Sequence, residues 1–338
     1  MPSKSMADLE AMVGDSRVTV EEFRIERGKV EEFARAITDR NPVFRDAVVA
    51  RERGYDRIPA PLTYARVSTF PRYRADGVEG HGFDLGFEPE YVLHGEQAYE
   101  YERPLQVGDV LTGTTTLSDV YQRDGGRAGT MTFAVYETAY RDGDDELVLT
   151  ERATVIETEG AVQNADAEER RDTAAGSSDA TSETAAATVG TEPDAEVRSP
   201  VTSIDDIAVG DTGPTIVVDD LSRQQFVKYA GASGDFNPIH YDEPYARAAG
   251  NESVFGQGMF TAGVTSRAVT DWVGLEAVSS FRVRFHSQVF PGETIIANGE
   301  VVDSQPSDGV VELALEATTH HGEPVLTGTA TVALSTDN

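Results

Sequence analysis

Apolar residues recur at helical spacing in both halves of the chain. In the first half they are Val30, Phe33, Ala34 and Ile37, and in the second half they are Phe226, Tyr229 and Ala230. Ser222 precedes the second group and can cap a helix there. Further along, Pro61–Val67 and Gly258–Val264 are apolar or small-sided on every face, so each is expected to begin a buried helix.

Strand-like runs follow each expected buried helix. They cover Leu111–Tyr121 and Met131–Ile156 in the first half, and Ile295–Asp303 and Val310–Leu334 in the second. The turns Asp124–Gly126 and Ser307–Gly309 separate these runs and favour hairpins. The pattern therefore predicts one buried helix and one antiparallel sheet in each half.

A polar segment divides the two halves. Residues 158–199 contain no aromatic residue and consist mainly of Ala, Glu, Asp, Thr, Ser and Gly. Such a segment cannot bury enough apolar area to offset its ordering entropy, so we expect a disordered linker. The length of 338 residues allows two domains, which we expect at residues 1–157 and 200–338.

The two halves repeat each other in sequence. Residues 39–44 and 235–240 share the frame Asp-x-Asn-Pro-[Val/Ile]-aromatic ring. Pro61 lies 47 positions before Gly108, whereas Gly258 lies 34 positions before Gly292. The first half therefore carries an insertion of 13 residues, which we place in the Gly-rich and aromatic stretch 75–87.

The charge is strongly negative, with 28 basic and 59 acidic residues and a net charge of −31. Only Lys4, Lys29 and Lys228 are lysines. An acidic surface repels nucleic acid and anionic lipid, and carboxylate excess with few lysines favours a protein from a salt-accumulating halophile. An acidic protein of an ordinary mesophile is the alternative.

Several function classes are excluded or disfavoured by what the sequence lacks. There is no cysteine, which excludes disulfides, thiolate nucleophiles and cysteine metal sites. No apolar run approaches the ~20 residues that span a bilayer, and residues 1–22 lack the apolar core of a signal peptide. We therefore expect a cytoplasmic protein.

The candidate chemistry lies in residues 231–240, a turn-rich segment that cannot be regular helix. Pro238 fixes its own φ and disfavours the helical region for Asn237. Asp235 and His240, five positions apart, are then displayed as two groups able to transfer protons. A lone Asp or His on a loop is usually a solvated or capping side chain, so the surrounding motif decides between the two interpretations.

That motif resembles a known family. Residues 229–240, Tyr-Ala-Gly-Ala-Ser-Gly-Asp-Phe-Asn-Pro-Ile-His, are similar to the signature of MaoC-like dehydratases, also called R-specific enoyl-CoA hydratases. Residues 255–259 lie where that family has a His-Gly-Met turn, although Gln257 replaces the usual histidine. Residues 92–96, Val-Leu-His-Gly-Glu, resemble the degenerate domain at the front of fused two-domain members.

The resemblance implies an α+β fold, a double hot-dog in which each half wraps an antiparallel sheet around a central helix. The two sheets then join edge to edge. It also implies reversible syn hydration of trans-2-enoyl-CoA to (R)-3-hydroxyacyl-CoA. Asp235 and His240 would be catalytic, the backbone N–H of Gly258 would stabilise the oxyanion, and Asn237 would hold the turn.

The internal repeat predicts one active site per chain. Phe44 stands where the second half has His240, and Pro61, which has no N–H, stands where it has Gly258. Asp39 remains, but without these partners. We therefore expect hydration only in the second half, while the first half leaves room for the acyl tail and the insertion shapes that room.

Substrate contacts are less specified. We expect Arg247, Arg267, Arg282 and Arg284 to be candidates for binding CoA phosphates, and we expect neither a cofactor nor a metal. His320 and His321 lack a third ligand at a plausible spacing, and they and His286 are expected on strands. His81, His94 and His286 are expected to be surface or satisfied polar residues, and Trp272 and Phe281, near the end of the central helix, are expected in the core.

Three questions stay open at this stage. The chain could instead be a hot-dog acyl-CoA thioesterase or a non-catalytic acyl-CoA binding module. An acyl carrier protein could replace CoA, although its acidic surface disfavours it. A monomer of fused halves and a homodimer are both compatible with the sequence.

Overall fold

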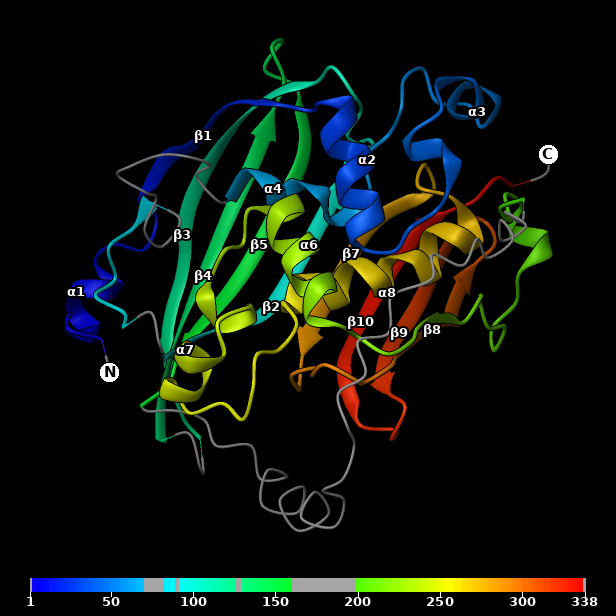
Figure 1. Cartoon of the computed structure of the whole chain (residues 1–338). Helices are drawn as coiled ribbons and strands as arrows, with labels where there is room; N and C mark the ends of the chain where they lie inside the picture. Colours follow the sequence, from blue (N-terminus) through cyan, green and yellow to red (C-terminus); the bar gives the residue numbers. More distant parts are fainter. Residues whose placement is uncertain (1, 70–81, 89–90, 126–128, 160–198, 337–338) are drawn as a thin grey trace, which may run out of the picture.

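The computed structural model of the chain describes residues 2–69, 82–88, 91–125, 129–159 and 199–336 (Figure 1). Most of the expected linker and the first part of the expected insertion lie outside these described residues, as does His81. No helix in the described ranges is long and apolar enough to cross a membrane.

One continuous antiparallel sheet contains the strands of both halves. Its order is β1-β3-β4-β5-β2-β7-β10-β9-β8-β6. The first-half strands are β1 Ser16–Arg24, β2 Val92–Tyr101, β3 Val110–Gly125, β4 Gly129–Arg141 and β5 Leu147–Glu157. The second-half strands are β6 Ile216–Val218, β7 Val278–Phe285, β8 Ile295–Gln305, β9 Val310–Thr319 and β10 Pro324–Ala333.

The two half-sheets meet where β2 pairs with β7. The pairing runs antiparallel from Glu96 opposite Arg284 to Glu100 opposite Ser280. From this joint outwards, each half has the same order of strands, so the repeat in sequence is also a repeat in topology. The predicted edge-to-edge double hot-dog is confirmed.

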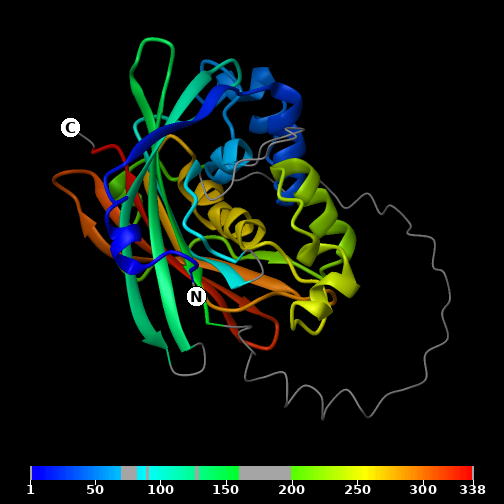
Figure 2. The ribbon, with the colours of Figure 1, turned by 90° about the vertical axis from the view of Figure 1, so that its left-hand side faces the viewer.

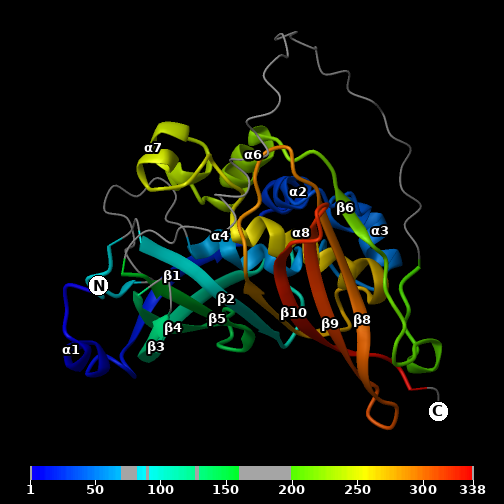
Figure 3. The same ribbon diagram turned by 90° about the horizontal axis from the view of Figure 1, so that it is seen from below.

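The central helix of the second half is α8, Gly258–Val273. Most of its residues are buried because nearly every face carries an apolar or small side chain. Figure 3 shows α8 between the sheet and a pair of helices, α2 Arg27–Ala36 and α6 Arg223–Ser233. The main core extends through both halves and includes Phe33, Tyr64, Phe226, Phe260 and Phe281.

The local helix signals in the sequence are confirmed. Val30, Phe33 and Ala34 form the buried face of α2. Ser222 caps α6 in a capping box, in which its Oγ accepts the N–H of Gln225 and the Gln225 side chain accepts the N–H of Ser222. The hairpin β8–β9 forms across the predicted turn Ser307–Gly309. The hairpin β3–β4 also forms, but Asp124 and Gly125 of its predicted turn pair within the sheet, and residues 126–128 lie outside the described ranges.

The first half does not build a helix like α8 within the described residues. Residues Leu62–Ala65 form a 3₁₀ turn, η2, followed by the short helix α4, Arg66–Thr69, which ends where the described range ends. The shared pattern of apolar and small residues therefore marks where a helix begins in each half, directly at Gly258 in the second half and after a 3₁₀ turn in the first.

The described part of the insertion packs away from the central helix. Phe83 and Leu85 are buried in a second, smaller core with Leu9, Leu117 and Tyr136. Leu9 belongs to α1, Met6–Glu10, which Figure 2 shows on the opposite face of the strands from α8. Residues 82–87 thus cover the outer face of β3 and β4.

Three histidine placements differ from the prediction. His320 and His321 lie in the turn between β9 and β10, and His286 follows the last residue of β7. The alternation of apolar and polar residues does not mark where a strand stops, so strand ends are the least determined part of such a prediction. Phe281 is buried, as expected, but on β7, while Trp272 on α8 is partly buried against the core.

Candidate active site

The segment that carries the candidate chemistry, residues 231–240, was expected to lie outside regular helix, but residues 231–233 are the last of α6, because Ala232 and Ser233 pack in the buried interior. The non-helical part begins at Gly234. Gly234 caps the helix with φ 89°, a left-handed conformation that glycine adopts at little cost. The N–H of Asp235 then donates to Ser233 Oγ at 3.1 Å. Asn237 caps the 3₁₀ turn η6, Pro238–His240, by accepting the N–H of Ile239 at 3.2 Å. These bonds hold Asp235 and His240 on one short, rigid turn.

His240 is buried, with 8% of its surface exposed. Its Nδ1 lies 2.8 Å from the carbonyl oxygen of Phe255. A carbonyl only accepts, so Nδ1 carries the proton and Nε2 is left as the acceptor. Burial lowers the pKa of the imidazole, while the Asp235 charge and the bond to Phe255 raise it less. The ring is therefore neutral at pH 7.

Gly258 is the first residue of α8. The N–H groups at the start of a helix have no acceptor within the helix, and the helix dipole favours negative charge there. A Cβ at position 258 would lie 3.2 Å from the ring of Phe285, so glycine leaves space beside this helix end. The preceding residue, Gln257, donates from Nε2 to the carbonyl of Phe226 at 3.1 Å and ties the start of α8 to α6.

A cavity of about 630 Å³ brings these residues together. Asp235, Asn237, His240 and Gly258 all line it. The opposite wall comes from the first half and includes Arg66 on α4, residues 91–94 at the start of β2, and Val155 and Thr158 at the end of β5. The cavity therefore lies between the two halves, and both contribute to it.

Two histidines in this cavity were not expected there. His94 on β2 and His286 after β7 both line it, and the His94 ring lies 5.1 Å from the Phe285 ring. His286 Nε2 lies 2.7 Å from Thr327 Oγ1. The resemblance of residues 92–96 to the family was the only feature of the sequence that pointed to His94. Its position in the cavity depends on the pairing of β2 with β7, which joins strands far apart in the sequence.

The four arginines expected to contact CoA do not line this cavity. Arg247 donates from Nε to Glu243 at 2.9 Å, and Arg284 donates from Nε to Glu96 at 2.9 Å. Arg282 lies exposed on β7. Arg267 donates to Thr38 Oγ1 at 2.8 Å and lines a different cavity.

The first half repeats the turn without the chemistry. Asn41 caps the 3₁₀ turn η1, Pro42–Phe44, with φ −56° and ψ 120°, against φ −59° and ψ 121° at Asn237. Its N–H donates to Asp39 Oδ1 at 2.9 Å. Phe44 is buried where the second half has its imidazole. The two turns thus share a backbone conformation, but the first has a phenylalanine in place of the imidazole of His240.

Asp39 is the titratable group that the first-half turn keeps. It is 5% exposed, and burial raises its pKa to about 7. The charge of Asp271 raises this pKa further, and the charge of Arg267 lowers it.

In the described ranges no group of three or more histidine, aspartate or glutamate side chains is arranged to hold a metal ion.

Comparisons with known proteins agree with this geometry. A family model of the FAS1-like dehydratase domain region matches residues 11–151, and a model of the MaoC like domain matches residues 184–321. The chain belongs to the MaoC-like dehydratase family, with one dehydratase region in each half and the double hot-dog fold. This membership supports a hydratase or dehydratase function in general terms.

Individual relatives cover different parts of the chain. A UPF0336 protein of Thermobifida fusca is 36% identical over 124 residues, which are 35% of this chain and 76% of the relative. Enoyl-CoA hydratase 2, peroxisomal, of Arabidopsis thaliana is 26% identical over 252 residues, which are 73% of this chain and 71% of the relative.

Solved structures agree with the fold over nearly the whole chain. A MaoC-like dehydratase superposes with a TM-score of 0.76 at 27% identity and covers 97% of this chain and 100% of its own. A Mycobacterium tuberculosis protein with a double hotdog fold gives a TM-score of 0.60 at 14% identity, covering 95% of this chain and 96% of its own.

Proposed function

We propose that this chain catalyses the reversible syn hydration of trans-2-enoyl-CoA to (R)-3-hydroxyacyl-CoA at the cavity between its halves. The observation that carries the proposal is that Asp235, His240 and Gly258 line this one cavity. Hydration of an enoyl thioester needs a base for water, a proton for C2 and a donor for the thioester oxygen. These three residues supply one group for each need.

The protonation state of His240 supports a role as base. Its neutral ring has Nε2 as an acceptor, and the Asp235 charge stabilises the imidazolium that forms when it takes a proton. A water held between the two side chains loses a proton to this pair as its oxygen attacks C3. The pair then returns a proton to C2 on the same face, and the reverse sequence dehydrates the product.

Negative charge that develops on the thioester oxygen requires a fixed donor. The N–H of Gly258 at the start of α8 suits this task, because it is preorganised and needs no movement during the reaction. The absence of a Cβ lets the thioester approach the helix end closely. Pro61 at the equivalent position of the first half has no N–H to offer.

The acyl chain would extend toward the first half. Leu93 and Val155 from that half and Phe285 from β7 give the cavity an apolar wall. The described residues of the insertion do not line the cavity, so the proposal that the insertion shapes the acyl space rests on residues 75–81, outside the described ranges.

The decisive experiment replaces the carboxylate while leaving its size unchanged. Asp235→Asn should lower kcat for hydration of crotonyl-CoA and longer enoyl-CoAs by about 10²–10⁴-fold, because proton transfer contributes about that much. The assay follows loss of the enoyl thioester in molar KCl and determines product chirality. Asp119→Asn, an exposed carboxylate on β3 outside the cavity, is the control and should keep full activity.

Four results would contradict all or part of the proposal. Full activity in Asp235→Asn removes the carboxylate from the mechanism. Release of free thiol without hydration makes the protein a thioesterase. Binding of enoyl-CoA without turnover makes it a binding module. Formation of the (S)-alcohol would overturn the stereochemical part.

A further inference from the structure

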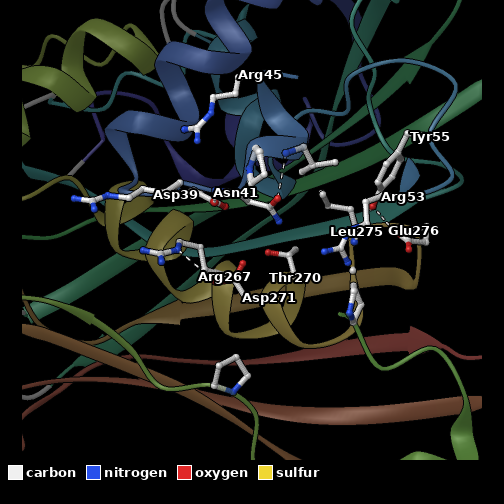
Figure 4. A pocket seen from close by; sticks show the side chains of 16 residues that line it. Asp39, Asn41, Arg45, Arg53, Tyr55, Arg267, Thr270, Asp271, Leu275 and Glu276 are labelled. Carbon is white, nitrogen blue, oxygen red and sulfur yellow. Dashed lines mark hydrogen bonds and ion pairs between the residues drawn. The ribbon is translucent and has the colours of Figure 1, made fainter. Parts of the chain in front are cut away.

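A second cavity, of about 440 Å³, lies at the turn of the first half. Asp39, Asn41 and Val43 line it on one side, and Arg267, Asp271 and Leu275 line it on the other. Figure 4 shows Asp39 and Asn41 on the side of the turn, and Arg267, Asp271 and Leu275 on α8 and the segment that follows it, on the far side of the cavity. The cavity is therefore built from both halves, as the catalytic cavity is.

The two cavities are counterparts within the internal repeat. Asp39, Asn41 and Val43 line the first, and Asp235, Asn237 and Ile239, each 196 positions later, line the second. The opposite walls are also alike, because Gly274–Glu276, just before β7, close the first cavity, and Tyr91–His94, where β2 begins, close the second. The first cavity is thus the counterpart of the candidate active site, with no imidazole among its lining residues.

The first-half cavity differs in charge from the cavity that contains His240. At the same separation of 196 positions, Arg40 stands where the catalytic cavity has Phe236, and Arg53 stands where it has Ala249. Arg45 and Arg267 add two further guanidinium groups to the lining. In a chain with a net charge of −31, four arginines around one cavity are a marked local concentration of positive charge.

The acidic groups of this cavity already have partners. Tyr55 donates its hydroxyl hydrogen bond to Glu276. Asp271 lies 3.8 Å from Arg267 Nε. Asp39 accepts the N–H of Asn41, and burial raises its pKa. By contrast, Arg45 and Arg53 form no salt bridge with a carboxylate of the described residues, although the charge of Arg45 acts on Asp39 and lowers its pKa. Both guanidinium groups can therefore contact a ligand in the cavity.

We propose that this cavity binds a phosphate group, with Arg45 and Arg53 as its cationic contacts, and catalyses no hydration. Guanidinium groups present paired N–H donors that match phosphate oxygens and keep their charge at every physiological pH. Pro42, Val43 and Leu275 line the same cavity and can contact an apolar part of a larger ligand. The phosphate could be one carried by CoA or free inorganic phosphate, since both offer the same group to the arginines.

Calorimetric titration of the whole chain with inorganic phosphate, at one fixed KCl concentration, tests the proposal. Replacing both contacts, Arg45→Ala with Arg53→Ala, should weaken phosphate binding about tenfold or more. Arg51→Ala is the matched control, because Arg51 is exposed on the neighbouring helix α3, Ala47–Glu52, and does not line the cavity. The double lysine variant, Arg45→Lys with Arg53→Lys, keeps the charge and should retain an intermediate affinity.

Competition of CoA and of pantetheine with bound phosphate shows where the phosphate group comes from. If CoA displaces phosphate and pantetheine does not, the site takes a phosphate of CoA; if neither displaces it, the site takes the free ion. Either result supports the proposal. Equal phosphate affinity in the wild type and the double alanine variant overturns it, as does the absence of measurable phosphate binding in the wild type.

Hydration measured in parallel separates this inference from the proposed function. The double alanine variant should hydrate enoyl-CoA with kcat/KM within about twofold of the wild type, since neither arginine lines the catalytic cavity. If no variant hydrates enoyl-CoA, the proposed function fails while the phosphate titration still decides the inference. A tenfold loss of hydration on removing the two arginines would contradict a separate, non-hydrating site.

Discussion

At the scale of single residues, the proposed hydration depends on which nitrogen of His240 carries the proton. The carbonyl of Phe255 accepts from Nδ1 and so leaves Nε2 as the acceptor for a substrate proton. Burial opposes the charged ring, and the nearby Asp235 favours it. The imidazole is thus held neutral but close to a carboxylate that stabilises it once protonated, which is what a general base requires.

This balance predicts the acid limb of the pH–rate profile. In the proposed mechanism the neutral ring is the active form, and burial lowers its pKa below the ordinary value of about 6.5. The kcat/KM for crotonyl-CoA should therefore stay constant as the pH falls through about 6.5 and should decline only at lower pH. An acid limb centred above that value would contradict the assignment of His240 as the base.

Titration of the ring itself provides the control. Replacing Asp235 by Asn removes the charge that raises the pKa of His240, so the pKa should fall further in Asp235→Asn. NMR of the histidine ring resonances measures this without any need for turnover. An unchanged pKa would show that the two side chains are not electrostatically coupled.

Some of these residues could be identified from the sequence and others could not. Asp235, Asn237 and His240 share one short turn, so their spacing alone places them together. His94, His286 and Arg66 are brought to the same cavity by strand pairing and by the packing of α4. Their positions depend on contacts between the halves, which no local pattern encodes.

At the scale of elements, α8 can pack closely against the first half because small residues face it there. Gly263 is one of these, since a Cβ added there would lie 2.5 Å from Ile37 Cγ2 and 3.3 Å from Thr63 Oγ1. Ile37 follows α2, and Thr63 belongs to η2. The glycine thus sets the distance between α8 and the first half.

A pair of glycine substitutions tests this packing. Gly263→Ala should lower the free energy of unfolding by about 1–2 kcal/mol, because overpacking outweighs the better helix propensity of alanine. Gly231→Ala in α6 is the matched control, since a Cβ there meets nothing within 4 Å. It should raise the free energy of unfolding by about 0.5–1 kcal/mol. Denaturant unfolding measures both, and equal effects of the two substitutions would contradict the argument.

Elements with strong local signals were predictable, and elements defined by partners were not. The cap of α6 and the two hairpins follow from residues close together in sequence. The short strand β6 and the 3₁₀ start of the first-half helix depend on what packs against them. The helix propensity of Pro61–Val67 alone does not distinguish a 3₁₀ turn from a longer helix.

At the scale of the whole molecule, one sheet connects the cavity that contains Asp235 and His240 with the corresponding cavity of the first half, which has Asp39 but no histidine. The joint at β2 and β7 places each turn opposite a wall from the other half. The fold could be predicted because the motif at residues 229–240 identified the family; hydrophobic periodicity alone predicted a helix and a sheet in each half but not how the sheets join. Neither the motif nor the periodicity indicated that arginines would surround the first-half cavity.

The net charge leads to a prediction for the molecule as a whole. We propose that the chain is adapted to concentrated salt, because 59 acidic residues against 28 basic ones repel one another in the compact state. Screening shortens the reach of this repulsion from about 10 Å at 0.1 M salt to about 3 Å at 1 M. The melting temperature should therefore rise by roughly 10 °C or more between about 0.1 M and about 2 M KCl.

Screening must be separated from the general effect of cosolutes on burial. Sucrose at equal osmolality stabilises proteins by exclusion from their surface but screens no charge, so it should reproduce only a minor part of the rise. Lowering the pH toward the sequence pI of about 4.4 reduces the net charge and should shrink the difference between low and high KCl. A melting temperature that is the same across the KCl series, or a rise that sucrose matches, would mean that repulsion among the carboxylates does not limit stability.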